Sequence, residues 1–167
     1  MDKTTATANE FDCNALRGNA QGFLSFIKRI FTEKFMRNAA REAALNIIFA
    51  QQFNSDCMDS LQKKIFKQFG LLENKEDLRF ALDLVSVVNT NREELLVEIE
   101  NACHHYLQNR INPTDKSILL IAMAEIKYFD DIPPVVSVSE AAGLARKYST
   151  ETSADFVNGV LSGVINK

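Results

Sequence analysis

Three basic residues, Lys34, Arg37 and Arg41, stand three and four positions apart in the sequence. At 100° per residue, this spacing places the three side chains within about 60° of one another on one helix face. Cations aligned in this way can contact successive phosphates of a nucleic acid strand. An ordinary solvated helix face would give the same pattern, and so the stripe predicts a nucleic-acid surface only with support from elsewhere in the chain.

Glu125 is the second residue whose surroundings suggest chemistry, because it is a carboxylate within the otherwise apolar run 118–126. An isolated charge in such a run would cost several kcal/mol, and Glu125 must therefore have partners. Acid–base catalysis is one interpretation. The sequence places no second carboxylate or base beside it, and we expect instead that Glu125 accepts hydrogen bonds from the N-terminal amides of another helix.

The histidines and cysteines do not form a recognisable site. His104 and His105 are adjacent, and their side chains point about 100° apart on a helix, which disfavours a shared metal ion. The three cysteines have no paired metal-ligand spacing and fit a reducing compartment. No glycine-rich phosphate loop is present. The sequence predicts a protein that is not an enzyme and that uses no metal or cofactor.

One helix must organise the elements that carry these residues. The run 118–126 has no polar face at helical periodicity, which predicts a helix over 113–129 that is buried on nearly all sides. Pro113 suits its first turn, Thr114 or Asp115 its cap, and Pro133 and Pro134 follow its end. We expect the other helices to pack around it.

Helical spacing of apolar residues recurs along the chain, and a period of two never persists for the length of a strand. The predicted helices, besides 113–129, cover residues 37–53, 58–69, 76–89, 92–108, 137–148 and 152–165. Seven helices in 167 residues indicate an all-α bundle.

The N-terminal part differs in composition. Residues 1–22 have few large apolar side chains, and we expect a disordered arm there. Residues 23–31 have the pattern of an amphipathic helix, which either folds onto the domain or seeks a membrane surface or partner. The sequence thus predicts an extension, 1–34, and a helical domain, 35–167. The cysteines that fit a reducing compartment and the lack of a leader pattern predict a cytoplasmic protein without membrane attachment. The net charge of −3 does not by itself indicate a nucleic-acid binder.

Several strings in the C-terminal half resemble the NusB transcription antitermination factor family. They are residues 115–126, the Asp-Ile-Pro at 131–133, residues 139–148, and Phe-Val-Asn-Gly-Val-Leu at 156–161, which is the most specific. Residues 40–45 resemble the family's first helix, so the resemblance covers about 36–167. It implies an all-α fold of two packed three-helix sub-bundles plus the first helix, and no catalysis.

The resemblance also implies partners. The family pairs with NusE, a small-subunit ribosomal protein, binds boxA-type single-stranded RNA, and joins the RNA polymerase antitermination complex, notably on ribosomal RNA operons. The residues expected to bind RNA, including the basic stripe, are Lys34, Arg37, Arg41, Phe49, Lys116, Phe156 and Asn158. Tyr106 and Asp115 are expected to bind the partner protein. Asn158 could equally satisfy a helix crossing.

This chain departs from the family pattern at Leu120, Ala124 and Thr152, and its arginine motif is thinned, which implies weaker RNA contact. The alternative function is a helical protein–protein module or a homodimer that hides its basic face and does not bind RNA directly.

Overall fold

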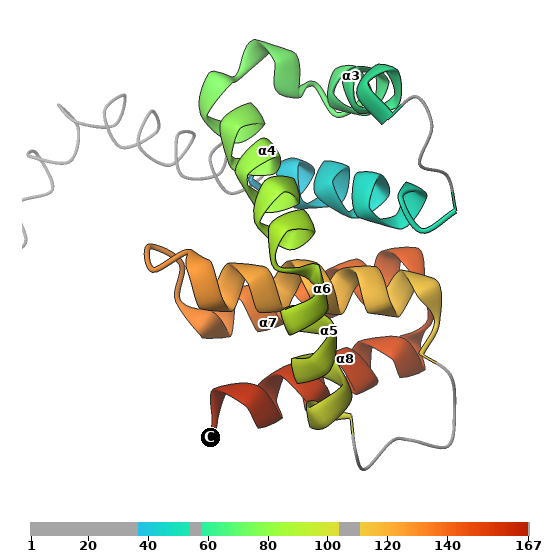
Figure 1. Ribbon diagram of the computed structural model, residues 1–167, viewed down its shortest axis with the longest axis vertical. Helices are drawn as coiled ribbons and strands as arrows, with labels where there is room; N and C mark the ends of the chain where they lie inside the picture. The colour runs from blue at the N-terminus through green and yellow to red at the C-terminus, as the bar shows by residue number, and fades with distance from the viewer. Residues whose placement is uncertain (1–36, 54–57, 104–110, 167) are drawn as a thin grey trace, which may run out of the picture. The chain divides into compact units, whose positions relative to one another are not determined.

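The computed structural model describes residues 37–53, 58–103 and 111–166, and these ranges contain helices and no strand (Figure 1). A helix runs through residues 37–50 and is called the first described helix below. The remaining elements are α3 (Met58–Gln68), η1 (Leu71–Glu73), α4 (Lys75–Thr90), α5 (Arg92–Ala102), α6 (Pro113–Tyr128), α7 (Pro134–Tyr148) and α8 (Glu151–Ile165). The predicted all-α fold is confirmed.

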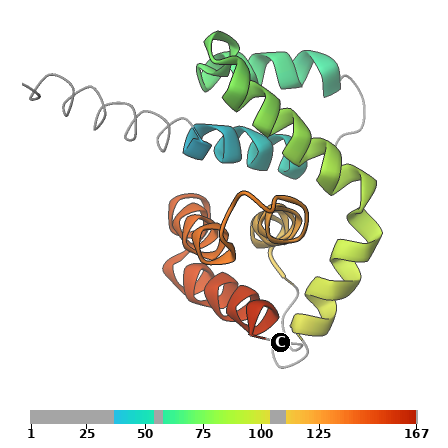
Figure 2. The ribbon, with the colours of Figure 1, turned by 90° about the vertical axis from the view of Figure 1, so that its left-hand side faces the viewer.

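The helices fall into two groups. The first described helix, α3 and α4 lie together on one side, while α6, α7 and α8 lie together on the other, with α5 running from one group to the other (Figure 2). Helix α6 contacts α4, α5, α7 and α8. The helix that the sequence predicts to be central therefore occupies that place.

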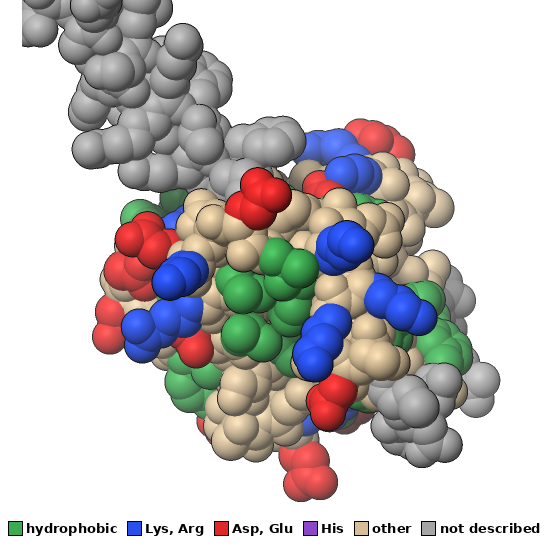
Figure 3. Space-filling model, turned by 90° about the horizontal axis from the view of Figure 1, so that it is seen from above, with side chains coloured by type: hydrophobic (Ala, Val, Ile, Leu, Met, Phe, Trp, Pro, Cys, Tyr) green, Lys and Arg blue, Asp and Glu red, His purple; other side chains and the backbone are tan. Residues whose placement is uncertain are grey.

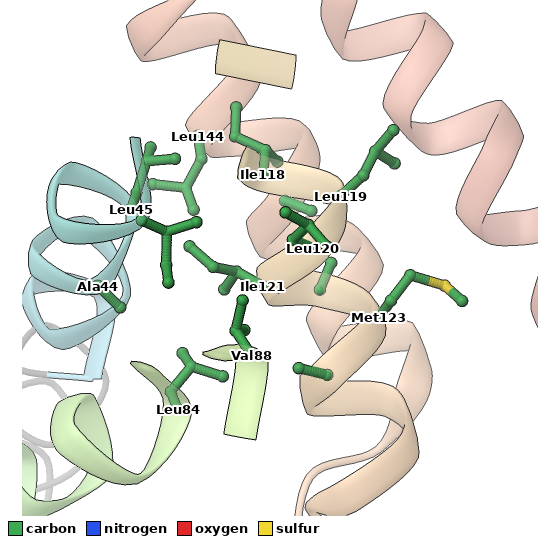
Figure 4. Packing of buried hydrophobic residues seen from close by; sticks show 14 of the residues in the cluster. Ala44, Leu45, Leu84, Val88, Ile118, Leu119, Leu120, Ile121, Met123 and Leu144 are labelled. Atoms are coloured by element: carbon green, nitrogen blue, oxygen red, sulfur yellow. The ribbon is translucent and has the colours of Figure 1, made fainter. Parts of the chain in front are cut away.

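Helix α6 lies in the core, which agrees with its lack of a polar face. Its residues from Ile118 to Ala124 are each no more than 2% exposed. They meet side chains of the first described helix, α4 and α7 that include Leu45, Leu84 and Leu144 (Figure 4). Burial of these aliphatic groups stabilises the bundle by about 1.5–3 kcal/mol for each large side chain.

Short polar side chains begin the helices. Asn74 accepts hydrogen bonds from the backbone N–H groups at the start of α4, and Thr150 does the same for α8. The α6 cap is Asn112, whose side chain accepts from the Thr114 N–H, so the predicted caps Thr114 and Asp115 are wrong. Pro113 occupies the first turn and lacks the N–H that would need a partner there, which moves the cap to Asn112.

Most predicted boundaries lie within one residue of the structure, and three differ by more. The first described helix ends at residue 50 and not at 53. Helix α7 begins at Pro134 and not at residue 137, because proline is compatible with a first helical turn. The described part of α5 ends at Ala102, and the remainder of the predicted helix 92–108 enters the undescribed residues 104–110. Predictions for residues 1–34 and for the domain boundary also lie outside the described residues.

Candidate nucleic-acid interface

Arg37 is the accessible basic residue near the start of the first described helix. Its side chain is 45% exposed, and its Nη1 lies 3.5 Å from Asp131 Oδ2 in the turn after α6. The guanidinium carbon lies 5.4 Å from the centre of the Phe80 ring on α4. The α6–α7 turn and α4 thus hold a cation that remains open to solvent.

Arg41, one turn later, is buried at 4% exposure. Its Nε donates to Glu125 Oε1 at 2.9 Å, and its Nη2 donates to the same oxygen at 2.6 Å. The Nη1 group donates to Asn38 Oδ1 at 3.3 Å. The same guanidinium lies 5.5 Å from the Phe80 ring centre. Arg41 therefore has a structural position between the first described helix, α4 and α6.

This ion pair corrects two predictions. Arg41 does not belong to a solvent-facing stripe, and Glu125 accepts from a guanidinium rather than from helix N-terminal amides. The physical reason is mutual compensation, because each charge would be costly in the core without the other. The two residues are 84 positions apart, and no local pattern could pair them. Lys34 lies outside the described residues.

A groove opens where several helices begin or end. Its described lining consists of Gln51, Gln52, Met58, Asn89, Arg92 and Lys116, and its volume is about 630 Å³. We call it the Lys116 groove. Gln52 Nε2 donates to the Pro113 carbonyl at 3.0 Å and to Ser117 Oγ at 2.5 Å, which ties the end of the first described helix to the start of α6.

Two cations in the Lys116 groove, Arg92 and Lys116, are half-buried, and neither forms an ion pair with a described residue. Gln51 Oε1 is buried and has no hydrogen-bond partner among the described groups. Elsewhere, Lys127 binds Glu94 and Glu98, and lowers the pKa of Glu94 below its usual value chiefly through its hydrogen bond to that carboxylate. The groove thus holds positive charge that nearby carboxylates do not neutralise.

An aromatic pair stands at the same helix end. Phe49 and Phe53 have ring centres 5.1 Å apart, and Phe53 is 67% exposed. Phe53 directly follows Gln52, which lines the Lys116 groove. An exposed aromatic ring can stack on a nucleic acid base.

The structure brings Phe49 and Lys116, two of the predicted RNA residues, to the elements that form this groove. Asn158 instead lines a separate hollow of about 400 Å³ between α7 and α8. Phe156, on the same helix, is half-buried. The prediction overlooked Arg92 and the two glutamines, whose only signal in the sequence is their position at helix ends.

Of the two residues expected to contact a partner protein, Asp115 is buried and Tyr106 is not described. Asp115 is 5% exposed, and its Oδ2 accepts a hydrogen bond from Ser153 Oγ at 2.9 Å. Its Oδ1 has no described hydrogen-bond partner. Asp115 therefore joins the starts of α6 and α8 and offers little surface of its own. Tyr106 lies within the undescribed residues 104–110.

The described part of the chain offers neither a metal-ion site nor a membrane-crossing helix. No cluster of three histidine, cysteine or carboxylate side chains there is arranged to hold a metal ion. None of the helices in that part has the length and apolar character needed to cross a bilayer.

Comparison with known proteins identifies the family. The NusB family model matches residues 38–166. The transcription antitermination protein NusB of Natranaerobius thermophilus is 34% identical over 132 residues, which cover 78% of this chain and 95% of that protein. The protein of the same name from Acetivibrio thermocellus is 36% identical over 129 residues, covering 77% and 88%.

Solved structures have the same fold. A crystal structure of antitermination factors NusB and NusE in complex with double-stranded RNA contains a chain that superposes with a TM-score of 0.69 at 24% identity, covering 78% of this chain and 96% of that one. The match of fold agrees with the match of sequence, which extends over most of both proteins. The chain therefore belongs to the NusB family.

Proposed function

We propose that this chain is a transcription antitermination factor that contacts RNA through the Lys116 groove. Its relatives at 34% and 36% identity are transcription antitermination proteins. The single observation that carries the RNA site is the pair of half-buried cations, Arg92 and Lys116, without ion-pair partners among the described residues. Arg146 and Lys147 of α7, by contrast, both form ion pairs.

The groups in and beside the groove suit a single RNA strand. Arg92 and Lys116 can contact phosphates, which position a strand without reading its sequence. The amides of Gln51 and Asn89 can donate to or accept from base edges. Phe53 offers a face for a base that has left its stack. A boxA-type single-stranded RNA is the ligand we propose.

NusE is the proposed protein partner. A protein with this fold has been crystallised with NusE and RNA, while this chain has a net charge of −3 and few unpaired cations in its groove. Weak binding by the chain alone is the expected consequence, with NusE supplying the remaining contacts within the RNA polymerase antitermination complex, notably on ribosomal RNA operons. Further proposed RNA contacts are Lys34, Arg37, Phe49, Phe156 and Asn158, and a further proposed partner contact is Tyr106.

The test measures RNA affinity as a function of salt for Lys116→Gln and Arg92→Gln. Each lost phosphate contact should reduce the salt slope for single-stranded RNA by about 0.7. Arg79→Gln is the matched control, because Arg79 is 83% exposed and its one ion pair with a described residue is to Asp83 on its own helix. Slopes equal to that of the unmodified protein in both groove variants would refute the site.

A second arm of the test adds NusE. Saturating NusE should tighten RNA binding by about 1–3 kcal/mol, and RNA should tighten NusE binding by the same factor. If the chain binds NusE or itself but no RNA under either condition, the alternative of a protein–protein module or homodimer replaces the proposed function.

A further inference from the structure

Helix α3 carries a basic face that the sequence prediction did not use. Lys63, Lys64 and Lys67 are exposed on it, and Asp59 is its one acidic residue. At 100° per residue the three lysines fall within an arc of about 100°. Figure 3 looks down on the face to which α3 contributes, and Lys and Arg side chains stand out from it.

These lysines, like Arg92 and Lys116 in the groove, have no acidic partner among the described residues. None of the three forms an ion pair with a described residue, whereas Arg79, Lys127 and Lys147 all do. Cations that are not engaged in ion pairs can neutralise phosphates and release the counterions condensed on a nucleic acid strand. The α3 lysines are therefore available for an anionic ligand without first breaking an ion pair.

The position of α3 connects this face with the Lys116 groove. Met58, the first residue of α3, lines the groove. A helix rises 1.5 Å per residue, which places Lys63 about 7.5 Å and Lys67 about 13.5 Å from Met58 along the axis. At 100° per residue, Lys63 and Lys67 also lie about 140° and about 180° around α3 from Met58, so a strand that leaves the groove past Met58 reaches them by crossing over α3.

The composition of the face favours RNA over a protein. Its exposed residues are Asp59, Ser60, Lys63, Lys64, Lys67 and Gln68, with no large apolar side chain among them. Protein interfaces depend on buried aromatic or aliphatic anchors and are depleted in lysine. Phosphate contacts need only cations.

We propose that Lys63, Lys64 and Lys67 form a second RNA-binding site, which holds the phosphates of the strand that extends beyond the Lys116 groove. This site rests on the proposed function, because the strand that reaches α3 is the one bound in the Lys116 groove. It contributes affinity and salt dependence but does not select bases.

The test compares two single-stranded RNAs, one of about six nucleotides and one of about fourteen, chosen within the usual range of single-strand site sizes. The full chain, with NusE present, is titrated with each RNA by fluorescence anisotropy. The test variant is Lys63→Gln/Lys67→Gln, and the charge-matched control is Arg79→Gln/Lys147→Gln. Glutamine preserves helix propensity, and the replaced side chains are exposed, so the fold should persist.

We expect the unmodified chain, the α3 variant and the control variant to bind the short RNA with equal affinity. The unmodified chain should bind the long RNA more tightly than the short RNA. In the α3 variant, the long-RNA salt slope should be smaller in magnitude by about 1.4 than in the unmodified chain. When salt is raised from about 50 to about 200 mM, the variant should therefore lose about sevenfold less affinity for the long RNA than the unmodified chain loses. The control should keep the full slope.

Two other results overturn the inference. If the α3 variant binds the short RNA normally and its long-RNA salt slope is unchanged, the second site alone is refuted. The same holds if the variant keeps that slope but binds NusE more weakly. Failure of the unmodified chain to bind either RNA would refute the proposed function and the second site with it.

Discussion

The buried ion pair between Arg41 and Glu125 gives the sharpest prediction about this chain. Arg41→Ala removes three charge-assisted hydrogen bonds and leaves Glu125, which is 1% exposed, without a counter-charge. Breaking a buried pair from one side costs about 3–5 kcal/mol. Domains of this kind have a free energy of unfolding of about 5–15 kcal/mol, so the loss would be a large fraction of the total.

The matched control is Arg37→Ala, on the same helix and one turn earlier. Arg37 also lies over the Phe80 ring, but its ion pair with Asp131 is exposed at both partners. An exposed pair contributes about 0–1 kcal/mol. The two arginine variants should therefore differ by at least 2 kcal/mol, roughly, in free energy of unfolding.

Replacing both partners tests the cause. In Arg41→Leu/Glu125→Leu no charge remains to be buried, and apolar side chains fill most of the volume. Such replacements of buried pairs are often neutral or stabilising. The double variant should therefore be more stable than Arg41→Ala, and the double-mutant cycle built from the Arg41→Leu and Glu125→Leu single variants should give a coupling energy of at least about 1 kcal/mol.

Urea unfolding followed by far-ultraviolet circular dichroism measures these differences from the midpoint and the slope. Thermal unfolding should show Arg41→Ala lower by roughly 10–20 °C in Tm. A loss below about 1 kcal/mol for Arg41→Ala would refute the reasoning, as would a double variant whose loss equals the sum of the two leucine single variants.

Three further predictions concern other parts of the chain. Asp115→Ala should cost about 1–2 kcal/mol because Ser153 loses an acceptor, whereas Asp115→Asn should keep most of the stability, and urea unfolding of both would test this. Burial, and then the charge of Glu100, raise the pKa of the Cys103 thiol; with the other two cysteines changed to serine, thiol labelling at neutral pH should be slow in the native protein and fast in urea, and equal rates would contradict this. A chain starting at Met36 should unfold cooperatively with nearly the Tm of the full chain, since the family match begins at residue 38, and an insoluble product would instead assign the preceding segment to the core.

The sequence by itself determined the helices and the identity of the central one. The apolar run 118–126 leaves no face for water at helical periodicity, so its burial follows from local spacing alone. Asn74 and Pro113 likewise mark helix starts through backbone chemistry that operates within a few residues. The strings at 115–126 and 156–161 indicated the family for the same reason, because they are contiguous in the chain.

Only the tertiary structure decided which charges are exposed and which are paired. Arg37 and Arg41 look equivalent in sequence, yet one reaches solvent and the other meets Glu125 on a helix 84 positions away. Arg92 and Lys116 come together because α5 and α6 both begin at one groove. Periodicity gives the direction of a side chain on its own helix, whereas the partner it meets depends on how helices distant in sequence pack, and that information is not local.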